Sequence, residues 1–294
     1  MARKITVRIQ GGFGNQLFQY AAGRSLALQT GASLFLNAWE YQSPVCRKYE
    51  LGKLKISDRQ TSRFRGDWEI KLRRRRYAPL RWLLEAMQSP LGYRRIIDAR
   101  QGFEARLATL TGNLYLDGYW HSERYFADIR EQLLQEFTFK EAPTPANADY
   151  LARILSQNAV CVHLRRGDYV AQAHFNARFG VCELPYYQSA IACLQPRLRN
   201  PAFFVFSDDP AWVSANFPRL DAMTLVTHNV GKDDAEDLRL MMNCKHFIIA
   251  NSTFSWWAAW LGRCPEKIVI APKRWFASPE ESDRDLVPET WLRL

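Results

Sequence analysis

The first forty residues pass from a period of two to a helical period in their hydrophobic positions. Residues 5–10 alternate apolar and polar side chains, which is typical of a half-buried strand. A glycine-rich turn at 11–14 follows, and apolar side chains from Leu17 to Leu28 then recur at helical spacing. Residues 32–36 form another short apolar run. This order of strand, turn, helix and strand predicts an opening βαβ unit.

The second half of the chain shows the same alternation more regularly. We expect helices between short apolar runs, with strands at 159–164, 202–206, 223–227, 247–250 and 268–270 and helices at 184–198, 210–217, 233–244 and 253–261. Apolar runs of this length between helices are typical of a parallel sheet that is covered on both faces. The sequence therefore predicts an α/β fold.

A polar segment separates the two halves. Residues 140–148 contain two prolines and no large apolar side chain, which indicates a linker. A single core rarely grows beyond about 250 residues, so a chain of 294 residues suits two domains. We expect domains at 1–148 and 149–294, facing each other across a cleft.

Composition narrows the class of protein further. The chain is 47% hydrophobic and 24% charged, which excludes a disordered or fibrous protein. No apolar run approaches the roughly 20 residues of a membrane-spanning helix, and the first ten residues lack the apolar block of a signal peptide. We therefore expect a soluble protein of the cytosol.

Cysteine and histidine spacings argue against a built-in metal. The six cysteines form no C-x-x-C pair, and the five histidines form no H-E-x-x-H motif. Isolated cysteines among apolar neighbours are usually buried thiols. We expect neither a structural zinc nor an obligatory disulfide.

Positive charge is concentrated in one segment. The net charge of the chain is +10, and residues 53–100 alone have 14 Lys or Arg against five acids. Arg73–Arg76 lie in this segment, with Trp68, Trp82 and Leu84 among the basic residues. Basic and aromatic residues mixed in this way favour an anionic membrane surface over a nucleic-acid backbone. A solvated basic face is the alternative interpretation.

The glycine turn is only a partial match to a dinucleotide site. Gly12 and Gly14 fit the fingerprint, but Leu17 occupies the place of the third glycine. Asn37 stands where an NAD site requires an acid for the ribose. The turn still permits a close backbone approach to a ligand, and Asn15 places an amide at the helix start. A simple strand-to-helix turn is the alternative.

Residues 161–169 form the second candidate element. On a strand, His163 and Arg165 share one face, and both emerge at the carboxyl end, where α/β sheets bind ligands. An arginine suits a phosphate there because its planar fork donates two hydrogen bonds and stays charged. A pairing of the arginine with Asp168 is the alternative.

Two acids follow the strand expected at 202–206. Asp209 precedes Pro210, and this order predicts a helix N-cap at Asp209. Asp208 is then left for a ligand hydroxyl or ring nitrogen. A divalent metal held by the two acids is the alternative interpretation. We rank that interpretation lower because the nearby arginines already neutralise phosphate charge.

The last candidate elements open two helices. Ser252 and Thr253 offer hydroxyls and free backbone N–H groups that suit a phosphate. The aromatic stripe at 254–260 is interpreted as core between helix and sheet. Glu236 and Asp237 open the preceding helix, where the helix dipole favours acids. Either carboxylate can accept two N–H bonds from a guanine edge.

Four blocks together resemble a known family. They are GGFGNQLFQYAAGRSLA, HLRRGDYV, FVFSDD and DLRLMMNCKHFIIANSTFSWWAAWL, in this order. The combination is similar to the α-1,2-fucosyltransferases, the inverting GDP-fucose enzymes of glycosyltransferase family 11. The resemblance implies a GT-B fold of two Rossmann-like domains, GDP-β-L-fucose as donor, and the 2-hydroxyl of a terminal galactose as acceptor. It implies no cofactor and no essential metal.

The resemblance also assigns residues to the donor. Arg165 would bind the β-phosphate, with His163 and Arg166 close by. The remaining donor contacts that it implies are Ser252, Thr253 and Phe254 on the diphosphate, with Asp208 and Asp237 on ribose or guanine. Related protein O-fucosyltransferases share the G-x-F-G-N-Q turn and contact the nucleotide with it, which points here to Phe13, Gly14 and Asn15.

The reaction requires a base for the acceptor hydroxyl. We choose Asp168 because it lies just past Arg165, and His174 and Glu183 in the following loop remain open alternatives. Charge that develops on GDP would be stabilised by Arg165 and by N–H groups at a helix start.

Cellular setting and rival functions follow from the same comparison. Animal relatives have an amino-terminal membrane anchor, whereas this chain begins almost at its first strand. We therefore expect a bacterial enzyme of O-antigen or lipopolysaccharide synthesis, cytoplasmic and peripheral on the inner face of the plasma membrane. Its partners would be GDP-fucose, a galactose-terminated glycan and an anionic membrane, with no nucleic acid. The alternatives are a GT-B transferase for another nucleotide sugar and an RNA-binding module.

Overall fold

The computed structural model describes residues 3–42, 47–57, 92–98, 102–229, 231 and 233–294. The chain divides into two compact units, Met1–Thr138 and Phe139–Leu294. The division precedes the predicted boundary at 148 because the expected linker already contains a helix start. Thr144 caps helix α5 (Pro145–Ser156), and its hydroxyl accepts the N–H of Asn147 at 3.4 Å.

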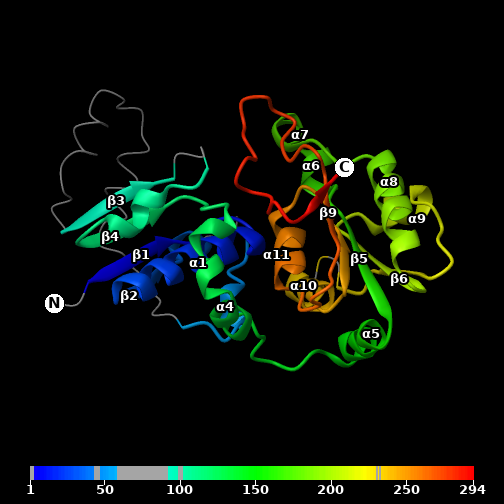
Figure 1. The fold of residues 1–294 in the computed structure, drawn as a ribbon, viewed down its shortest axis with the longest axis horizontal. Coiled ribbons are helices and arrows are strands. Elements are labelled where there is room, and N and C mark those ends of the chain that lie inside the picture. Colours follow the sequence, from blue (N-terminus) through cyan, green and yellow to red (C-terminus); the bar gives the residue numbers. More distant parts are fainter. Residues whose placement is uncertain (1–2, 43–46, 58–91, 99–101, 230, 232) are drawn as a thin grey trace. The chain divides into compact units, whose positions relative to one another are not determined.

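The first unit contains a parallel sheet whose described strands run in the order β2-β1-β4-β3 (Figure 1). These strands are β1 (Lys4–Arg8), β2 (Ser33–Asn37), β3 (Tyr93–Ile97) and β4 (Asn113–Asp117). The other elements are α1 (Phe13–Thr30), η1 (Trp39–Gln42), η2 (Leu51–Lys53), η3 (Ala105–Thr109), η4 (Glu123–Tyr125), η5 (Ala127–Ile129) and α4 (Arg130–Glu136). The opening β1-α1-β2 unit is the one that the sequence predicts.

Helix α1 positions the glycine turn. It begins at Phe13 and ends at Thr30, and the capping residue Gly31, with φ 63°, donates its N–H to the carbonyls of Ala27 and Leu28. Leu17 and Phe18 are fully buried. The helix is therefore fixed at its end and by its apolar face, and the turn before it is held against the carboxyl end of β1.

The second unit contains a parallel sheet in the order β10-β9-β8-β5-β6-β7. The strands are β5 (Asn158–Leu164), β6 (Pro201–Ser207), β7 (Met223–Val226), β8 (His246–Ile248), β9 (Val269–Ala271) and β10 (Leu292–Arg293). The helices after α5 are α6 (Gly167–Ala171), α7 (Ala173–Phe179), α8 (Leu184–Leu194), η6 (Gln195–Arg197), α9 (Pro210–Asn216), α10 (Asp234–Met242) and α11 (Thr253–Leu261). Every pairing is parallel, as the sequence predicts.

The core of the second unit lies on both faces of its sheet. Val160 and Val162 of β5 pack with Tyr187 of α8 and Val213 of α9. Figure 1 shows α8 and α9 on one side of this sheet and α10 and α11 on the other. The tryptophans of α11 are buried, with exposures of 0%, 0% and 3% for Trp256, Trp257 and Trp260. The prediction that this aromatic stripe is core is confirmed.

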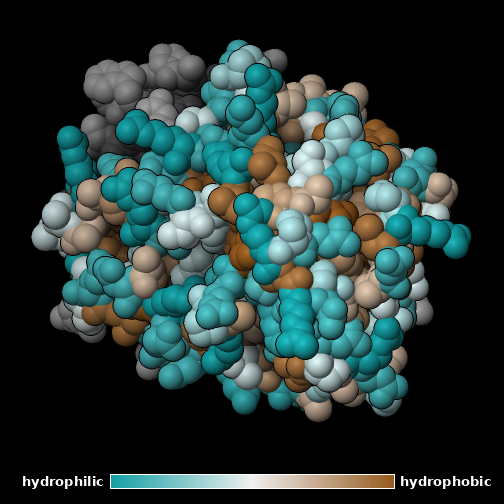
Figure 2. Space-filling view, turned by 45° about the vertical axis from the view of Figure 1, so that its right-hand side comes forward, coloured by the Kyte–Doolittle hydropathy of each residue, from teal (hydrophilic) through white to brown (hydrophobic). Residues whose placement is uncertain are grey.

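Several sequence predictions concern the outside of the fold. The visible face is mostly hydrophilic (Figure 2), as expected when apolar side chains fill the interior. Among the described helices, none is long and apolar enough to cross a membrane. Most of the basic segment, including Arg73–Arg76, Trp68, Trp82 and Leu84, lies outside the described residues.

The five described cysteines carry free thiols, whereas Cys46 lies outside that part of the chain.

Candidate functional site

Strand register brings an arginine and two acids together in the second unit. Leu164 of β5 pairs with Ser207 of β6, so the next residues, Arg165 and Asp208, leave the sheet side by side. Arg165 Nη1 lies 2.9 Å from Asp208 Oδ2, and its Nη2 donates to Asp168 Oδ1 at 2.6 Å. The guanidinium is therefore held between two carboxylates at the carboxyl edge of the sheet.

Arg166 completes this arrangement. Its backbone N–H donates to Asp208 Oδ1 at 2.8 Å, and its Nε lies 3.4 Å from Asp209 Oδ2. Its guanidinium carbon is 3.5 Å from the ring centroid of Trp212, a cation–π contact. Asp209 Oδ1 accepts the N–H of Trp212 at 3.1 Å, which confirms the predicted N-cap of α9. Asp208 and Asp209 thus both contact an arginine. The guanidinium groups supply the positive charge that a metal ion bound by these carboxylates would supply.

The sequence analysis expected Asp208 to be available for a ligand, but the structure shows its carboxylate already engaged. Both of its oxygens already accept hydrogen bonds or ion pairs from Arg165 and Arg166, so it helps to orient Arg165. Gly167 makes room for this contact, because a Cβ there would lie 2.5 Å from Asp208 Oδ2. The Arg-Arg-Gly-Asp sequence is thus a compact turn built around the carboxylate of Asp208.

His163 lies beneath this cluster as a neutral imidazole. Its side chain is 5% exposed, and burial, assisted by the charge of Arg165, lowers its pKa to about 4 against the opposing effect of Asp208. Its ring centroid is 5.9 Å from that of Phe254. Among the described residues, its Nδ1 has no hydrogen-bond partner. A neutral ring at this place adds no further positive charge.

The residues after β8 form the adjacent edge of the site. Ser252 caps α11 by accepting the N–H of Phe254 at 3.3 Å, so Thr253 and Phe254 stand in the first turn as predicted. Asn251 is 2% exposed, and its side-chain amide donates to the carbonyls of Phe179 at 2.8 Å and Trp275 at 3.1 Å. Because β8 pairs with β5, this helix start lies beside the strand that leads to Arg165.

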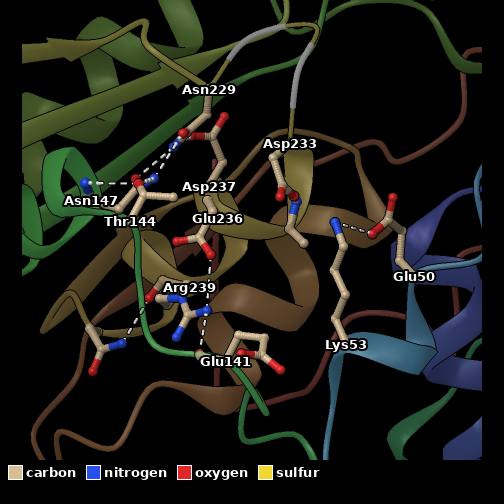
Figure 3. Close-up of polar contacts among 12 residues, drawn as sticks. Glu50, Lys53, Glu141, Thr144, Asn147, Asn229, Asp233, Glu236, Asp237 and Arg239 are labelled. Carbon is tan, nitrogen blue, oxygen red and sulfur yellow. Dashed lines mark hydrogen bonds and ion pairs between the residues drawn. The ribbon is translucent and has the colours of Figure 1, made fainter.

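Asp237 lies in a network of buried amides (Figure 3). Asn229 donates to Asp237 Oδ1 at 2.9 Å, and Asn229 and Asn147 exchange two amide hydrogen bonds of 2.8 and 3.0 Å. Burial, together with the negative charges of Asp234, Asp233 and Glu236, raises the pKa of Asp237 to about 7, against the hydrogen bond from Asn229. This carboxyl group therefore changes its charge near neutral pH.

Glu236 and Asp237, the two candidate acids at the start of α10, have different partners in the structure. Glu236 Oε1 accepts a hydrogen bond from Arg239 at 2.9 Å, and Arg239 also donates to the carbonyl of Glu141 at 3.0 Å. Glu236 is thus engaged in a buried ion pair, which leaves Asp237 as the candidate ligand. Asn147 and Asn229 were missed by the sequence analysis. The Thr144-Pro145 capping signal was the local sign of helix α5, which carries Asn147.

The predicted turn residues of the first unit differ in exposure. Phe13 and Gly14 are buried, whereas the side chain of Asn15 is partly exposed. Asn15 Oδ1 lies 3.0 Å from Nε2 of His121, a residue that the sequence analysis did not select. Asn15 is therefore the member of the turn that can offer a side chain to a ligand.

The three candidates for a general base have different surroundings. Asp168 is paired with Arg165, with its side chain 14% exposed. His174 lies exposed on α7, where its ring contacts that of Phe175 at 4.2 Å between centroids. Glu183 is exposed at the residue before α8. Within the described residues, no group of three or more His, Cys, Asp or Glu side chains is placed to hold a metal ion.

Comparisons of the sequence with known proteins agree on a family. The profile of glycosyl transferase family 11 matches residues 92–294. An alpha-1,2-colitosyltransferase of Escherichia coli is 33% identical over 99% of this chain and 98% of its own length. The O-antigen biosynthesis glycosyltransferase WbnK of Escherichia coli is 29% identical over 97% of this chain and 99% of its own. Galactoside 2-alpha-L-fucosyltransferase Sec1 of Mus musculus is 29% identical over 87% of this chain and 64% of its own.

A solved structure supports the fold. An Arabidopsis thaliana FUT1 variant in complex with GDP matches 92% of this chain and 70% of its own, with a TM-score of 0.57 and 11% sequence identity. Both units of the chain also have the parallel sheets of Rossmann-like domains. The predicted GT-B fold is confirmed.

Proposed function

The chain belongs to glycosyl transferase family 11, and we propose that it transfers L-fucose from GDP-β-L-fucose to the 2-hydroxyl of a terminal galactose, with inversion. The names of the mammalian relatives support this donor sugar and this linkage. Colitose is the second candidate sugar, because the colitosyltransferase is similar over nearly its whole length. Colitose is L-fucose without its 3-hydroxyl, so one site can suit either sugar.

The arginine held by two carboxylates carries this proposal. As the bond from fucose C1 to phosphate breaks, negative charge grows on the β-phosphate of GDP. Arg165 is already oriented at the edge of the sheet by Asp168 and Asp208, so it needs little reorganisation to stabilise that charge. The N–H groups at the start of α11 add partial positive charge. This arrangement is the basis for the proposal that no metal is required.

Other donor contacts follow from the resemblance and agree with the local geometry. Ser252, Thr253 and Phe254 would surround the diphosphate, and His163 and Arg166 would flank Arg165. Asp237 would accept the N–H groups of guanine, with Asn229 holding its carboxylate. Asp208 would act through Arg165 rather than on ribose, because both of its oxygens are engaged. The turn of Phe13, Gly14 and Asn15 would supply the remaining contact.

The base is the least constrained part of the mechanism. In an inverting displacement, the base lies on the sugar face opposite the leaving group. Asp168 contacts the arginine that we assign to the leaving phosphate, and this contact favours a positioning role over the role of base. His174 and Glu183 are therefore retained beside Asp168 as base candidates.

The acceptor and the cellular place are proposed from the relatives and the basic segment. The relative named for O-antigen biosynthesis supports a bacterial surface glycan as acceptor, and the name of the mammalian galactoside enzyme supports a terminal galactose on it. We propose a lipid-linked acceptor, and the charge of residues 53–100 would hold the enzyme beside it at the cytoplasmic face of an anionic membrane.

A donor and acceptor panel tests the proposal. The purified chain is incubated with GDP-fucose or GDP-colitose and methyl β-galactoside, and the product linkage is read by NMR. We expect an α-1,2-linked product with methyl β-galactoside and no product with its 2-deoxy analogue. The ratio of the kcat/KM values for GDP-fucose and GDP-colitose then identifies the preferred donor. Thermal shifts with GDP, UDP and a short RNA serve as the control. Stabilisation by UDP or RNA, with no transfer from either GDP donor, would favour the rival functions.

A further inference from the structure

A hydrogen bond in the first unit joins residues far apart in sequence. Asn15 lies in the first turn of α1, and His121 follows β4. His121 Nε2 lies 3.0 Å from Asn15 Oδ1 across a separation of 106 residues. A carboxamide oxygen only accepts hydrogen bonds, so Nε2 must carry the proton in this contact. The contact therefore fixes both the protonated nitrogen of His121 and the orientation of the Asn15 amide.

The amide nitrogen of Asn15 rests on the glycine turn. Gly11 has φ 80°, and a Cβ at this residue would lie 2.7 Å from Asn15 Nδ2. Only glycine leaves this space without strain. The turn is itself held in place, because the carbonyl of Gly11 accepts the Tyr41 hydroxyl at 2.7 Å and the Gln16 side-chain amide at 3.2 Å. The oxygen of Asn15 thus points to His121 and the nitrogen lies over the turn.

The ring of His121 is held independently of Asn15. It stacks on Tyr119, with centroids 5.1 Å apart and an interplanar angle of 18°. It also meets Phe18 edge to face at 5.0 Å, and Phe18 is fully buried. Two aromatic side chains therefore set the position of the imidazole, so the histidine can act as a fixed support for the amide.

We propose that His121 is a positioning residue for the transfer reaction: it orients the carboxamide of Asn15 so that Nδ2 donates a hydrogen bond to an oxygen of the bound substrate. The proposal rests on the function proposed above, in which the glycine turn contacts the donor. Without the Nε2–H donor, the amide is free to rotate and to present its oxygen where an N–H group is needed. His121 acts through Asn15 and does not touch the substrate.

A double-mutant cycle tests this coupling. His121→Phe keeps an aromatic ring against Tyr119 but removes the N–H group, whereas His121→Gln keeps an N–H donor. We expect His121→Phe to lower kcat/KM by about 10- to 100-fold, because small misplacements of reacting groups have effects of this size. His121→Gln should stay within about threefold of wild type by the same reasoning. In an Asn15→Ala background, His121→Phe should cause no further loss.

Two outcomes of the cycle would overturn the proposal. One is an equal decrease in kcat/KM from His121→Phe in the wild-type and Asn15→Ala backgrounds, which indicates a purely structural effect. The other is a His121→Gln variant as inactive as His121→Phe. Thermal unfolding of wild type and the four variants identifies any variant that does not fold. If His121→Phe does not fold, the activity of His121→Gln decides between the two roles.

A measurement without substrate separates this proposal from the proposed function. The ¹⁵N NMR signals of the His121 ring, identified by their loss in His121→Phe, should show a protonated Nε2. A ring protonated at Nδ1 alone would overturn the positioning role, whatever the enzyme transfers. Absence of transfer from both GDP donors, with the expected tautomer present, would contradict only the proposed function.

Discussion

Arg165 and Asp208 form an ion pair, 2.9 Å from Nη1 to Oδ2, because their strands are in register at Leu164 and Ser207. Asp168 holds the other terminal nitrogen of the same guanidinium. The sheet therefore presets the orientation of the charge before any ligand binds. Preorganised charge of this kind is the main contribution to many transfer reactions.

Substitution of Arg165 should nearly abolish transfer. Arg165→Lys keeps a positive charge but cannot span Asp168 and Asp208 with a planar fork. We expect a loss of about 10²- to 10³-fold in kcat, as for other donors aimed at developing charge. Arg165→Ala should lose at least as much and should also unfold more easily, because it leaves two carboxylates without their cation. Steady-state kinetics and thermal unfolding check this. A rate above about a tenth of wild type would contradict the assignment.

Gly167→Ala should mimic the loss of Asp208. The added methyl group would lie 2.5 Å from Asp208 Oδ2, so the carboxylate must move away from Arg165. We expect kcat to fall about 10-fold or more, with a smaller effect on thermal stability. Gly52→Ala is the matched control, because its methyl group would meet only Tyr49 at an ordinary 3.5 Å. Equal activity of the two variants would show that the position of Asp208 does not matter.

Local signals explain why part of this site was predictable. The Asp209-Pro210 pair marked a helix cap, and the apolar run before Arg165 marked a strand end. Both features depend on neighbours within a few residues, and the structure shows them where the sequence analysis expected them. The common edge of parallel strands then placed these ends together without further information.

Partners that depend on strand order could not be found in this way. The pairing of Asp208 with Arg165 needs the β5-β6 register, and the contact of Asn15 with His121 joins the first turn of α1 to the loop after β4. Strand β3 was also missed because two of the five residues in its sequence, YRRII, are arginines and because it lies within the basic segment. No local pattern states which strand will lie next to which, so such contacts appear only in the folded chain.

Transfer should not depend on a divalent metal. Arg165 and Arg166 already contact both acids that follow β6 and supply positive charge there. We expect the rate to be unchanged by excess EDTA, measured with the galactoside assay. Complete loss of activity, followed by recovery with magnesium or manganese, would instead reassign Asp208 and Asp209 as metal ligands.

The basic segment should bind anionic lipid. Residues 53–100 provide most of the net charge, and each basic residue near such a surface contributes about 1 kcal/mol. Replacement of Arg73–Arg76 by Gln should weaken binding to phosphatidylglycerol vesicles, most clearly at low salt. Transfer to a small soluble galactoside should change little. A variant with normal vesicle binding but no soluble activity would place these arginines in the acceptor site or the fold.

Asp237 should make stability depend on pH. Its pKa is about 7 in the folded chain against an ordinary value of 3.8, so between these values the folded state holds a proton that the unfolded state has lost. The free energy of unfolding therefore falls as pH rises through this window. Asp237→Asn removes the titration but keeps an oxygen for the amide of Asn229. Urea unfolding at pH 5 and pH 8 should show a smaller fall for this variant than for wild type.

Binding of GDP should show the opposite dependence on pH. A guanine edge donates N–H groups, so it needs the carboxylate of Asp237, and the affinity should weaken by up to about tenfold per pH unit below the pKa. Calorimetry at pH 6 and pH 8 should show this change for wild type and for Asp221→Asn, a control that removes an exposed acid before β7 whose charge is not among those that raise the pKa of Asp237. Asp237→Asn should bind weakly at both values. An equal pH dependence in all three proteins would remove Asp237 from the nucleotide site, because the titrating group would then lie elsewhere.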